Sequence, residues 1–439
     1  MSCNEWKDSE IGRIPYKWDI YTVEELINME ILDKPLDGNH GSIHPTQKDF
    51  VQSGIPFIMA SDIKDGHIDY DSCKFITEEL SKTLKKGFAK EGDILLTHKA
   101  TIGRTCLVEK LNVPYIVLTP QVTYYRVLNH KKLNNKFLRY YFEFYKFKEL
   151  LNGWAQSGST RAYIGITSQR KLPILLPTLE EQEKIANILS SLDDKIQLNN
   201  EMNKTLEEMA QSIFKRWFVD FEFPNEDGEP YKSSGREMVD SELGMIPKGW
   251  EVKCIYDLAE YINGTSFKAK DYSDKGLPII KIAELKNGVT DGTKFFSGEK
   301  DKKFYLKNRD ILFSWSGNPD TSIDTFIWDK GDAILNQHIF KVIPKFDKGY
   351  AFTYLMLKYL KSTFTHIARN KQTTGLGHVT VKDLKELKIA LCFSKIKEFN
   401  EVAEPIVDLI FENNMNIELL NKTRDSLLPK LMNGEIRVK

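Results

Sequence analysis

The sequence contains residues of the types that enzymes use, but their spacing does not complete a catalytic motif. Gly87 and Gly92 have the glycine spacing of a phosphate-binding loop, yet Asp93 stands where that loop requires lysine. Gly-Leu-Gly at 375–377 lacks the third glycine of a dinucleotide-binding turn. Asn-Pro-Asp at 318–320 lacks the second proline and the aromatic residue of a pocket that holds a flipped base for methylation. We therefore predict that this chain has no catalytic centre.

His40 and His44 are four residues apart, which is a metal-ligand spacing only on a helix. The glycine between them and the proline after them oppose a helix, so we expect a polar loop and no metal site. The cysteines at positions 3, 73, 106, 254 and 392 include no Cys-x-x-Cys pair and are expected to be reduced thiols of a cytoplasmic protein. No apolar run approaches the ~20 residues of a membrane-spanning helix, and the polar N-terminus is unlike a targeting peptide.

Short words of the sequence recur in the same order, which indicates an internal duplication. Residues 9–18 and 241–250 share Ser-Glu, Gly, Ile-Pro and Trp at the same spacing. Gly-x-Pro-x-Ile then occurs at 54–58 and 276–280, Asp-Ile-Leu occurs at 93–95 and 310–312, and Gln121 falls opposite Gln337. The offset between the copies decreases along the chain, so loops differ in length while the order of elements persists.

The net charge is zero, but the charges are segregated along the chain. Residues 1–178 carry 24 basic and 21 acidic side chains, and residues 244–396 carry 25 and 17. The remaining segments, 179–221, 222–243 and 397–439, are acidic. Alternating basic and acidic blocks are typical of a protein that binds a polyanion with some segments and proteins with others.

Each copy is expected to contain a strand-rich region followed by helices. Short β-branched and aromatic runs, broken by Gly, Pro and Asn, predict the strands. Aromatic helical stretches follow at 134–151 and 349–366. We expect the aromatic stripe of the first stretch to be packed core, with a base-stacking surface as the alternative; its members are Phe137, Tyr140, Tyr141, Phe144 and Phe147.

Each copy ends in a long helix with a heptad pattern. Thr178 and Glu181 make a capping box at the start of the first helix. Seam positions alternate at four and three residues, which predicts that the two helices form a coiled coil; separate amphipathic helices on two cores are the alternative. Asn199 and Asn413 occupy equivalent seam positions, where a polar pair can fix the register. The seam consists of Ile185, Leu189, Leu192, Ile196, Asn199, Leu206, Ile213, Ile406, Ile410, Asn413, Ile417, Leu420 and Leu427.

The predicted fold class is α+β, with two domains in internal tandem repeat that are separated by two long antiparallel helices forming a coiled coil. The expected boundaries are 1–178 for the first domain, 179–221 for the first helical spacer, 222–243 for a linker, 244–396 for the second domain and 397–439 for the second helical spacer.

Over essentially its whole length, the chain resembles the specificity subunit of type I restriction–modification systems. The most specific words are Pro-Ile-Leu-Leu-Pro at 173–177, Leu-Glu-Glu-Gln-Glu-Lys-Ile-Ala at 179–186, the two Asp-Ile-Leu words, and Leu-Leu-Pro-Lys-Leu-Met-Asn-Gly-Glu-Ile at 427–436. The second copy departs from the family pattern at 392–397, where Cys-Phe-Ser-Lys-Ile-Lys replaces the entry word of the helix.

The resemblance implies a division of labour between this chain and its partners. Each domain would be a target-recognition domain that reads one half of a bipartite, asymmetric sequence in double-stranded DNA. The helices would separate the domains and dock two methyltransferase (modification) subunits, which bind S-adenosylmethionine. ATP-dependent restriction/translocase subunits would join the complex. This chain would then carry no cofactor, no metal and no catalytic residue.

Base contacts are expected from Gly/Ser/Thr-rich loops that lie in equivalent places of the two copies, after Asp-Ile-Leu and before the long helix. Arg104 and Arg161 could instead contact phosphates or form structural ion pairs, and a shared structural role is expected for Gln121 and Gln337. Lysine clusters such as 82–86 are expected to be solvated surface, with phosphate contact as the alternative. The candidate DNA-binding residues are Lys99, Thr101, Arg104, Ser159, Thr160, Arg161 and Tyr163 in the first domain, and Ser314, Trp315, Ser316, Asn318, Thr373, Thr374 and His378 in the second.

Two other classes of function fit the sequence less well. A stand-alone methyltransferase or nuclease with duplicated recognition domains would need the motifs that are missing. An adapter whose domains bind protein is opposed by the positive charge of the domains, although only modestly for the first one. Within the resembled family, a solitary subunit that supports modification without restriction fits equally well.

Overall fold

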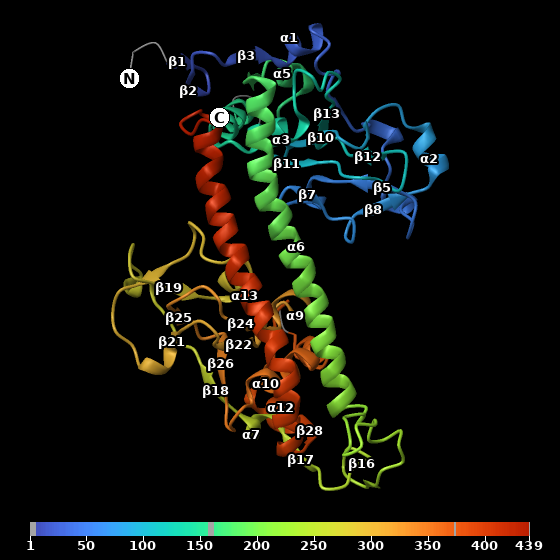
Figure 1. Ribbon diagram of the computed structural model, residues 1–439, viewed down its shortest axis with the longest axis vertical. Helices are drawn as coiled ribbons and strands as arrows, with labels where there is room; N and C mark the ends of the chain where they lie inside the picture. Colours follow the sequence, from blue (N-terminus) through green and yellow to red (C-terminus); the bar gives the residue numbers. More distant parts are fainter. Residues whose placement is uncertain (1–5, 157–161, 373–374, 439) are drawn as a thin grey trace. The chain divides into compact units, whose positions relative to one another are not determined.

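The computed structural model describes residues 6–156, 162–372 and 375–438, which divide into two compact units (Figure 1). The first unit consists of residues 1–195 and 420–439, and the second consists of residues 196–419. Each unit therefore combines one copy of the repeat with a helical segment that belongs to the other copy.

The first unit contains two four-stranded sheets. One is antiparallel throughout, in the order β11 (Thr101–Leu107), β10 (Ile94–Lys99), β13 (Val122–Tyr125) and β4 (Leu36–Asp37). The other has a parallel central pair, in the order β8 (Lys74–Ile76), β5 (Ile55–Ile58), β12 (Ile116–Leu118) and β9 (Phe88–Ala89). All residues of the parallel strands β5 and β12 are buried, which explains why these runs are apolar without alternation.

Shorter elements complete the first unit. Three two-stranded pairs join β1 (Trp6–Ser9) to β2 (Gly12–Pro15), β3 (Asp19–Thr22) to β14 (Pro173–Leu176), and β6 (Ile63–Lys64) to β7 (His67–Ile68). Its short helices are α1 (Val23–Asn28), α2 (Glu78–Thr83), α3 (Asn135–Glu143), α4 (Tyr145–Gln156) and α5 (Ile166–Gln169).

The second unit repeats this topology, as the duplicated words predict. Its antiparallel sheet has the order β24 (Asp324–Ile327), β22 (Ile311–Ser314), β26 (Ile339–Pro344) and β18 (Ala259–Asn263). Its other sheet again has a parallel central pair, in the order β20 (Phe295–Phe296), β19 (Leu277–Ile280), β25 (Ala333–Leu335) and β21 (Tyr305–Leu306). Strand by strand, β10 corresponds to β22, β13 to β26 and β4 to β18.

Other elements complete the second unit, and one of them, α9, lies between β22 and β24, whereas only Ala100 separates the equivalent strands β10 and β11. Two-stranded pairs join β15 (Met238–Val239) to β16 (Ile246–Pro247), β17 (Glu251–Cys254) to β28 (Lys388–Leu391), and β23 (Ser316–Gly317) to β27 (Gly377–His378). Its short helices are α7 (Ile255–Leu258), α8 (Ile282–Asn287), α9 (Pro319–Ser322), α10 (Tyr350–Tyr359), α11 (Lys361–Asn370) and α12 (Val381–Glu386).

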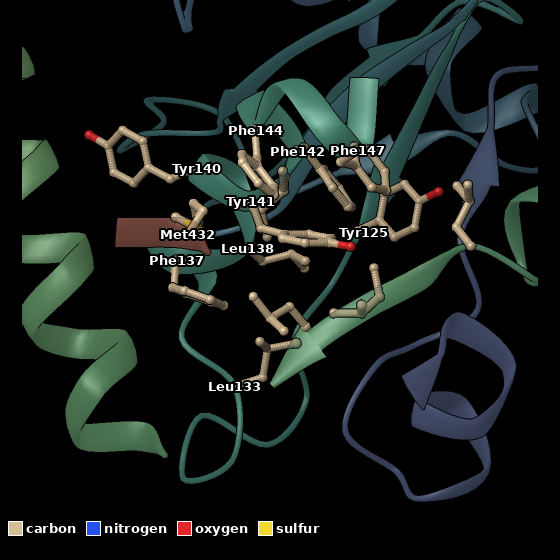
Figure 2. Packing of buried hydrophobic residues seen from close by; sticks show 14 of the residues in the cluster. Tyr125, Leu133, Phe137, Leu138, Tyr140, Tyr141, Phe142, Phe144, Phe147 and Met432 are labelled. Carbon is tan, nitrogen blue, oxygen red and sulfur yellow. The ribbon is translucent and has the colours of Figure 1, made fainter. Parts of the chain in front are cut away.

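The aromatic stripe of the first copy is packed core. Figure 2 shows the rings of Phe137, Tyr141, Phe144 and Phe147 gathered near Leu133 and Leu138, whereas the Tyr140 ring points away from them. The five residues of the stripe are at most 2% exposed, and the rings of Phe142 and Phe147 stack with their centroids 4.9 Å apart. The prediction of core is confirmed, because no face of the stripe is left for a base to stack on.

The two long helices are α6 (Leu179–Phe218) and α13 (Phe393–Met432), each 40 residues long. The predicted cap of α6 is present, since the Glu181 amide donates to Thr178 Oγ1 at 3.3 Å. Helix α13 begins at Phe393, four residues before the predicted boundary at 397, in the segment where the entry word is missing.

The helices pair in antiparallel fashion within each unit. In the first unit, Ile185 and Leu189 of α6 share a core with Leu431 of α13 and with the domain. In the second unit, Phe214 of α6 meets Phe399 of α13 with ring centroids 6.0 Å apart. The predicted seam is therefore shared with the domains: five members are buried and the others are half-buried. The buried ones are Ile185, Leu189, Asn199, Ile410 and Asn413.

The polar register contact involves a different asparagine from the predicted one. Asn413 Nδ2 donates to Asn203 Oδ1 at 2.9 Å, and Asn203 Nδ2 donates to Asn414 Oδ1 at 2.8 Å. Asn199 lies one turn earlier, is 1% exposed, and its Nδ2 has no hydrogen-bond partner among the described residues. The sequence pattern identified Asn199 and Asn413 as buried seam residues, but Asn413 contacts Asn203, one turn after Asn199 in α6.

The segment predicted as a linker, 222–243, is folded onto the second unit. Phe223 is 2% exposed and lies between two stacked rings, Tyr231 at 4.7 Å and Trp250 at 5.0 Å. Asn225 Oδ1 accepts hydrogen bonds from the backbone amides of Asp227 and Glu229, which closes a tight acidic turn.

No helix in the described part of the chain has the length and apolar character needed to cross a membrane.

Candidate nucleic-acid interface

In the first unit, one end of the antiparallel sheet gathers segments that are far apart in the sequence. The His98 amide donates to the Gln121 carbonyl at 3.0 Å, and Asp37 of β4 pairs with Thr123 of β13. The chain that precedes the long helix returns to the same place, where the Ile164 amide donates to the His98 carbonyl at 3.0 Å. We call residues 37–40, 98–101, 121 and 162–164 the first sheet end.

The second unit builds the same arrangement with the same backbone bonds. The Trp315 amide donates to the His338 carbonyl at 3.4 Å, and the Val379 amide donates to the Trp315 carbonyl at 2.8 Å. Ser316 pairs with His378, and Asn263 pairs with Phe340. We call residues 263–265, 315–318, 337–338 and 377–379 the second sheet end.

Both loops that sequence reasoning selected in each copy thus meet at one sheet end. In the first unit the contact is an isolated bridge between Lys99 and Tyr163, and in the second unit it is the pair of strands β23 and β27. Five of the candidate residues, Ser159, Thr160, Arg161, Thr373 and Thr374, lie outside the described residues.

The described candidates of the first unit differ in exposure and in contacts. Tyr163 is 43% exposed, and the Lys99 ammonium lies 5.9 Å from the centre of its ring. Thr101 is exposed at the start of β11. Arg104 Nη1 donates to the carbonyls of Ala60 and Ile63 at 3.2 and 3.3 Å. Arg104 therefore connects β11 to residues 60–63 through backbone carbonyls while it stays exposed, so its predicted roles in phosphate contact, base contact or a structural ion pair stay predictions.

In the second unit, Trp315, Ser316 and His378 are half-buried at the sheet end. Asn318 is exposed, and its Oδ1 accepts the Asp320 amide at 2.9 Å as the cap of α9. Ser314 differs from the prediction, because β22 continues through it and its side chain is completely buried. Ser314 is an interior strand residue, so the placement of this side chain on a surface loop is wrong.

The register of the sheets also corrects one equivalence between the copies. Thr97 pairs with Val122, and Ser314 pairs with Ile339. The residue that precedes β13, Gln121, therefore corresponds to His338, not to Gln337. The two glutamines do not share a position, and the structural role inferred from that match loses its basis.

Sequence reasoning missed the strand that completes each sheet end. Asp37 and Asn263 end the equivalent strands β4 and β18, and a glycine follows each of them. A Cβ on Gly38 would lie 1.9 Å from the Leu118 carbonyl oxygen, and one on Gly264 would lie 2.1 Å from the Asn336 carbonyl oxygen. Only glycine permits this close approach of two backbones. The signal that could have found these positions is the polar-glycine word, Asp-Gly at 37–38 and Asn-Gly at 263–264.

Asp37 is the electrostatic centre of the first sheet end. It is 3% exposed, its Oδ1 accepts from the Lys86 ammonium, and its Oδ2 lies 2.7 Å from His40 Nε2. Burial alone would raise the pKa of Asp37, but the hydrogen bonds and charges of Lys86 and His40 outweigh it and hold the pKa below its ordinary value. The carboxylate is therefore ionised and fixes both donors.

His98 lies beside this group and is completely buried. Burial lowers its pKa, so the ring is neutral near pH 7. Nδ1 lies 2.9 Å from the Ile164 carbonyl oxygen and must carry the proton, which leaves Nε2 as an acceptor without a partner among the described residues.

The second sheet end carries amide, indole and imidazole groups at the equivalent positions. Trp315 Nε1 donates to Asn263 Oδ1 at 3.1 Å, and Gln337 Nε2 lies 3.3 Å from His338 Nε2. Asn263, Gln337 and His338 are all exposed. Amides, indole and imidazole are the groups that hydrogen-bond or stack on bases, and none of them suits covalent catalysis in this arrangement.

In the described part of the chain, no group of three or more His, Cys, Asp or Glu side chains could hold a metal ion.

Comparison with known proteins agrees with this geometry. A family model described as "Type I restriction modification DNA specificity domain" matches residues 15–208 and 247–397. The MjaIX type I restriction enzyme specificity subunit of Methanocaldococcus jannaschii is 27% identical over 99% of this chain and 97% of its own length. The HindI specificity subunit of Haemophilus influenzae is 27% identical over 62% of this chain and 71% of its own length.

A solved structure has the same fold. The crystal structure of a type I restriction–modification S subunit from M. genitalium superposes with a TM-score of 0.57 at 14% identity, and the match covers 94% of this chain and 96% of that one. The two matched segments of the family model coincide with the two copies of the repeat and cover most of the chain. The chain therefore belongs to the type I restriction–modification DNA specificity family, and it is a DNA-recognition subunit of the non-catalytic kind.

Proposed function

We propose that this specificity subunit reads a bipartite, asymmetric sequence in double-stranded DNA, with one half-site read by each unit. The observation that carries the proposal is the pair of sheet ends, which have the same backbone bonds and different side chains. Two domains that recognise different half-sites need the same backbone arrangement and different hydrogen-bonding side chains.

The proposal assigns the chemistry to partner subunits. Two methyltransferase subunits dock on the long helices and bring S-adenosylmethionine, restriction subunits bring ATP, and this chain carries no cofactor. Apolar side chains at the surface of α6 and α13 support protein docking there; they are Ile188, Leu198, Met209, Val402, Leu409 and Met415, all at least 36% exposed. The complex acts in the cytoplasm, which agrees with the free thiols of the four described cysteines.

The test is to co-express the chain with the modification subunit of its own system and to map methylated adenines across the host DNA. The expected result is one motif of two short words around a fixed gap. A stable complex that methylates no DNA would overturn the proposal.

The adapter alternative is tested on the same complex with random duplex. A DNA reader loses affinity steeply as salt increases, because each phosphate contact releases counterions. Affinity that does not change between about 50 and 200 mM salt would favour an adapter that binds protein.

A further inference from the structure

We propose that the residue ending β4 and β18, Asp37 in the first unit and Asn263 in the second, determines which kind of base its unit reads. The inference rests on the proposed function. In the second unit the Asn263 amide itself reads an adenine, whereas in the first unit Asp37 holds the Lys86 ammonium as the donor for a guanine.

The two positions are equivalent by three independent observations. Their strands pair with the same neighbour, since Asp37 faces Thr123 and Asn263 faces Phe340 at corresponding places of β13 and β26. Both are followed by a glycine that approaches a backbone carbonyl too closely for any side chain. Both lie at the sheet end where the chain before the long helix returns. The frame is thus constant, and the polar side chain differs.

In the second unit the asparagine is held at the surface in one orientation. Its Oδ1 accepts the Trp315 indole proton at 3.1 Å, which identifies Oδ1 and places the Nδ2 donor on the other side of the amide. The Trp315 ring lies 5.7 Å from both His338 and Phe340, so the indole itself is fixed. An amide offers a donor and an acceptor side by side, and this pattern matches N7 and N6 of adenine in the major groove.

In the first unit the equivalent group cannot face DNA, because the Asp37 carboxylate is 3% exposed and already satisfied. The groups that it orients are more accessible: the His40 side chain is 50% exposed and that of Lys86 is 33% exposed. Asn39 fixes the segment that carries the lysine, because its Oδ1 accepts the Lys85 amide at 2.9 Å and its Nδ2 donates to the Lys86 carbonyl at 2.6 Å. The His40 Nε2 proton is already donated to Asp37, whereas the Lys86 ammonium has three N–H donors, of which Asp37 accepts one. A lysine ammonium matches the O6 and N7 acceptors of guanine.

The principal experiment uses the Asn263→Asp variant in the complete complex with its modification subunits. The substitution keeps the acceptor for Trp315 and removes the amide donor. We expect one adenine of the second word to become cytosine or to lose its selectivity by about tenfold or more, because a carboxylate accepts from cytosine N4. The first word and the gap should stay unchanged. An unchanged second word, or an equal loss of methylation at every site, would overturn the inference.

The matched experiment in the first unit uses Lys86→Gln, which removes the ammonium and keeps an amide donor for Asp37. One guanine of the first word should relax toward adenine, with the second word unchanged. Lys110→Gln is the control, because Lys110 is an exposed cation beyond the far end of β11 and should leave both words as they are. A Lys86→Gln profile identical to that of Lys110→Gln would overturn the assignment for the first unit.

Trp315→Phe separates positioning from structure. The phenyl ring keeps the packing against Phe340 but cannot hold the amide. We expect loss of selectivity at the same base that Asn263→Asp affects, with an unchanged melting temperature. Loss of stability with every base still read correctly would contradict a positioning role. If the unaltered complex shows no two-word motif, the proposed function fails; if it shows one that all variants preserve, only this inference fails.

Discussion

Asp193 of α6 and Arg424 of α13 form an ion pair in the first unit, with 2.8 Å between Oδ1 and Nη1. The other oxygen of Asp193 accepts from Arg139 at 2.6 Å and from the Tyr140 hydroxyl at 2.7 Å. Asp193 is 7% exposed, so one buried carboxylate joins both long helices to the recognition domain of this unit. We expect this group to be the main polar determinant of how the first domain is held on its helices.

Replacing Asp193 by alanine should lower the free energy of unfolding by about 3–5 kcal/mol, because it leaves the Arg139 and Arg424 charges without their buried partner. Asp194→Ala is the matched control, since Asp194 is the exposed neighbour on the same helix. Urea unfolding of both variants measures the effect. Equal stability of the two variants would contradict the role of the network.

The same carboxylate predicts a pH dependence. Burial raises the pKa of Asp193, but the charge of Arg139 and the hydrogen bonds from Arg424, Tyr140 and Arg139 outweigh it, so the folded pKa lies below the ordinary 3.8. A depressed folded pKa contributes stability that is present above 3.8 and is lost as the pH falls through the folded pKa. The stability difference between the natural protein and Asp193→Asn should therefore be constant from about pH 7 to 5 and should shrink as the pH falls below about 4. A difference that grows on acidification would contradict this assignment.

Asn199, which is buried, and Asn203, which is half-buried, should respond oppositely to the same change. Asn203→Leu removes both hydrogen bonds to Asn413 and Asn414 and should lower the melting temperature, at a cost of about 1–3 kcal/mol. Asn199→Leu replaces a buried amide whose nitrogen has no described partner and should leave stability unchanged or raise it by about 1 kcal/mol. Calorimetry of Asn203→Leu and Asn199→Leu measures the two melting temperatures. An equal loss of stability in both variants would contradict the different roles of Asn199 and Asn203.

Gly38→Ala and Gly264→Ala should each destabilise their own unit by about 2 kcal/mol or more, because the new methyl group would overlap a backbone carbonyl that has no room to move. Gly153→Ala is the control, since a Cβ there meets nothing within 4 Å and the helix α4 should gain from alanine. Chemical unfolding with a tryptophan probe in each unit compares them. Normal stability of Gly38→Ala would show that the close approach is not needed.

Much of the fold was predictable because its signals are local. The capping motif of Thr178 and Glu181 predicted the start of α6. The segment around Cys392 and Ser394 has no such motif, and the predicted start of α13 was four residues too late. The sheet ends were found only in part. The repeat made the segments of Lys99 and Tyr163 visible as Gly/Ser/Thr-rich, although Lys99 ends strand β10 and does not lie in a loop. Asp37 reaches them through a two-residue strand paired with a segment distant in sequence. No periodicity exists over two residues, so such a pairing leaves no pattern to read.

The length of the helices predicts how far apart the two words are read, which rests on the proposed function. Four residues inserted between Asn199 and Asn203, with four more inserted opposite them in α13, add one turn of about 6 Å to the pair. At about 3.4 Å per base pair, the unread gap should lengthen by about two base pairs while both words stay the same. The helix insertions leave every residue of the sheet ends in place, so altered words would point to damage in the domains. Mapping methylated adenines for the inserted and natural chains measures the gap, and an unchanged gap with both words intact would mean that the helices do not set the separation.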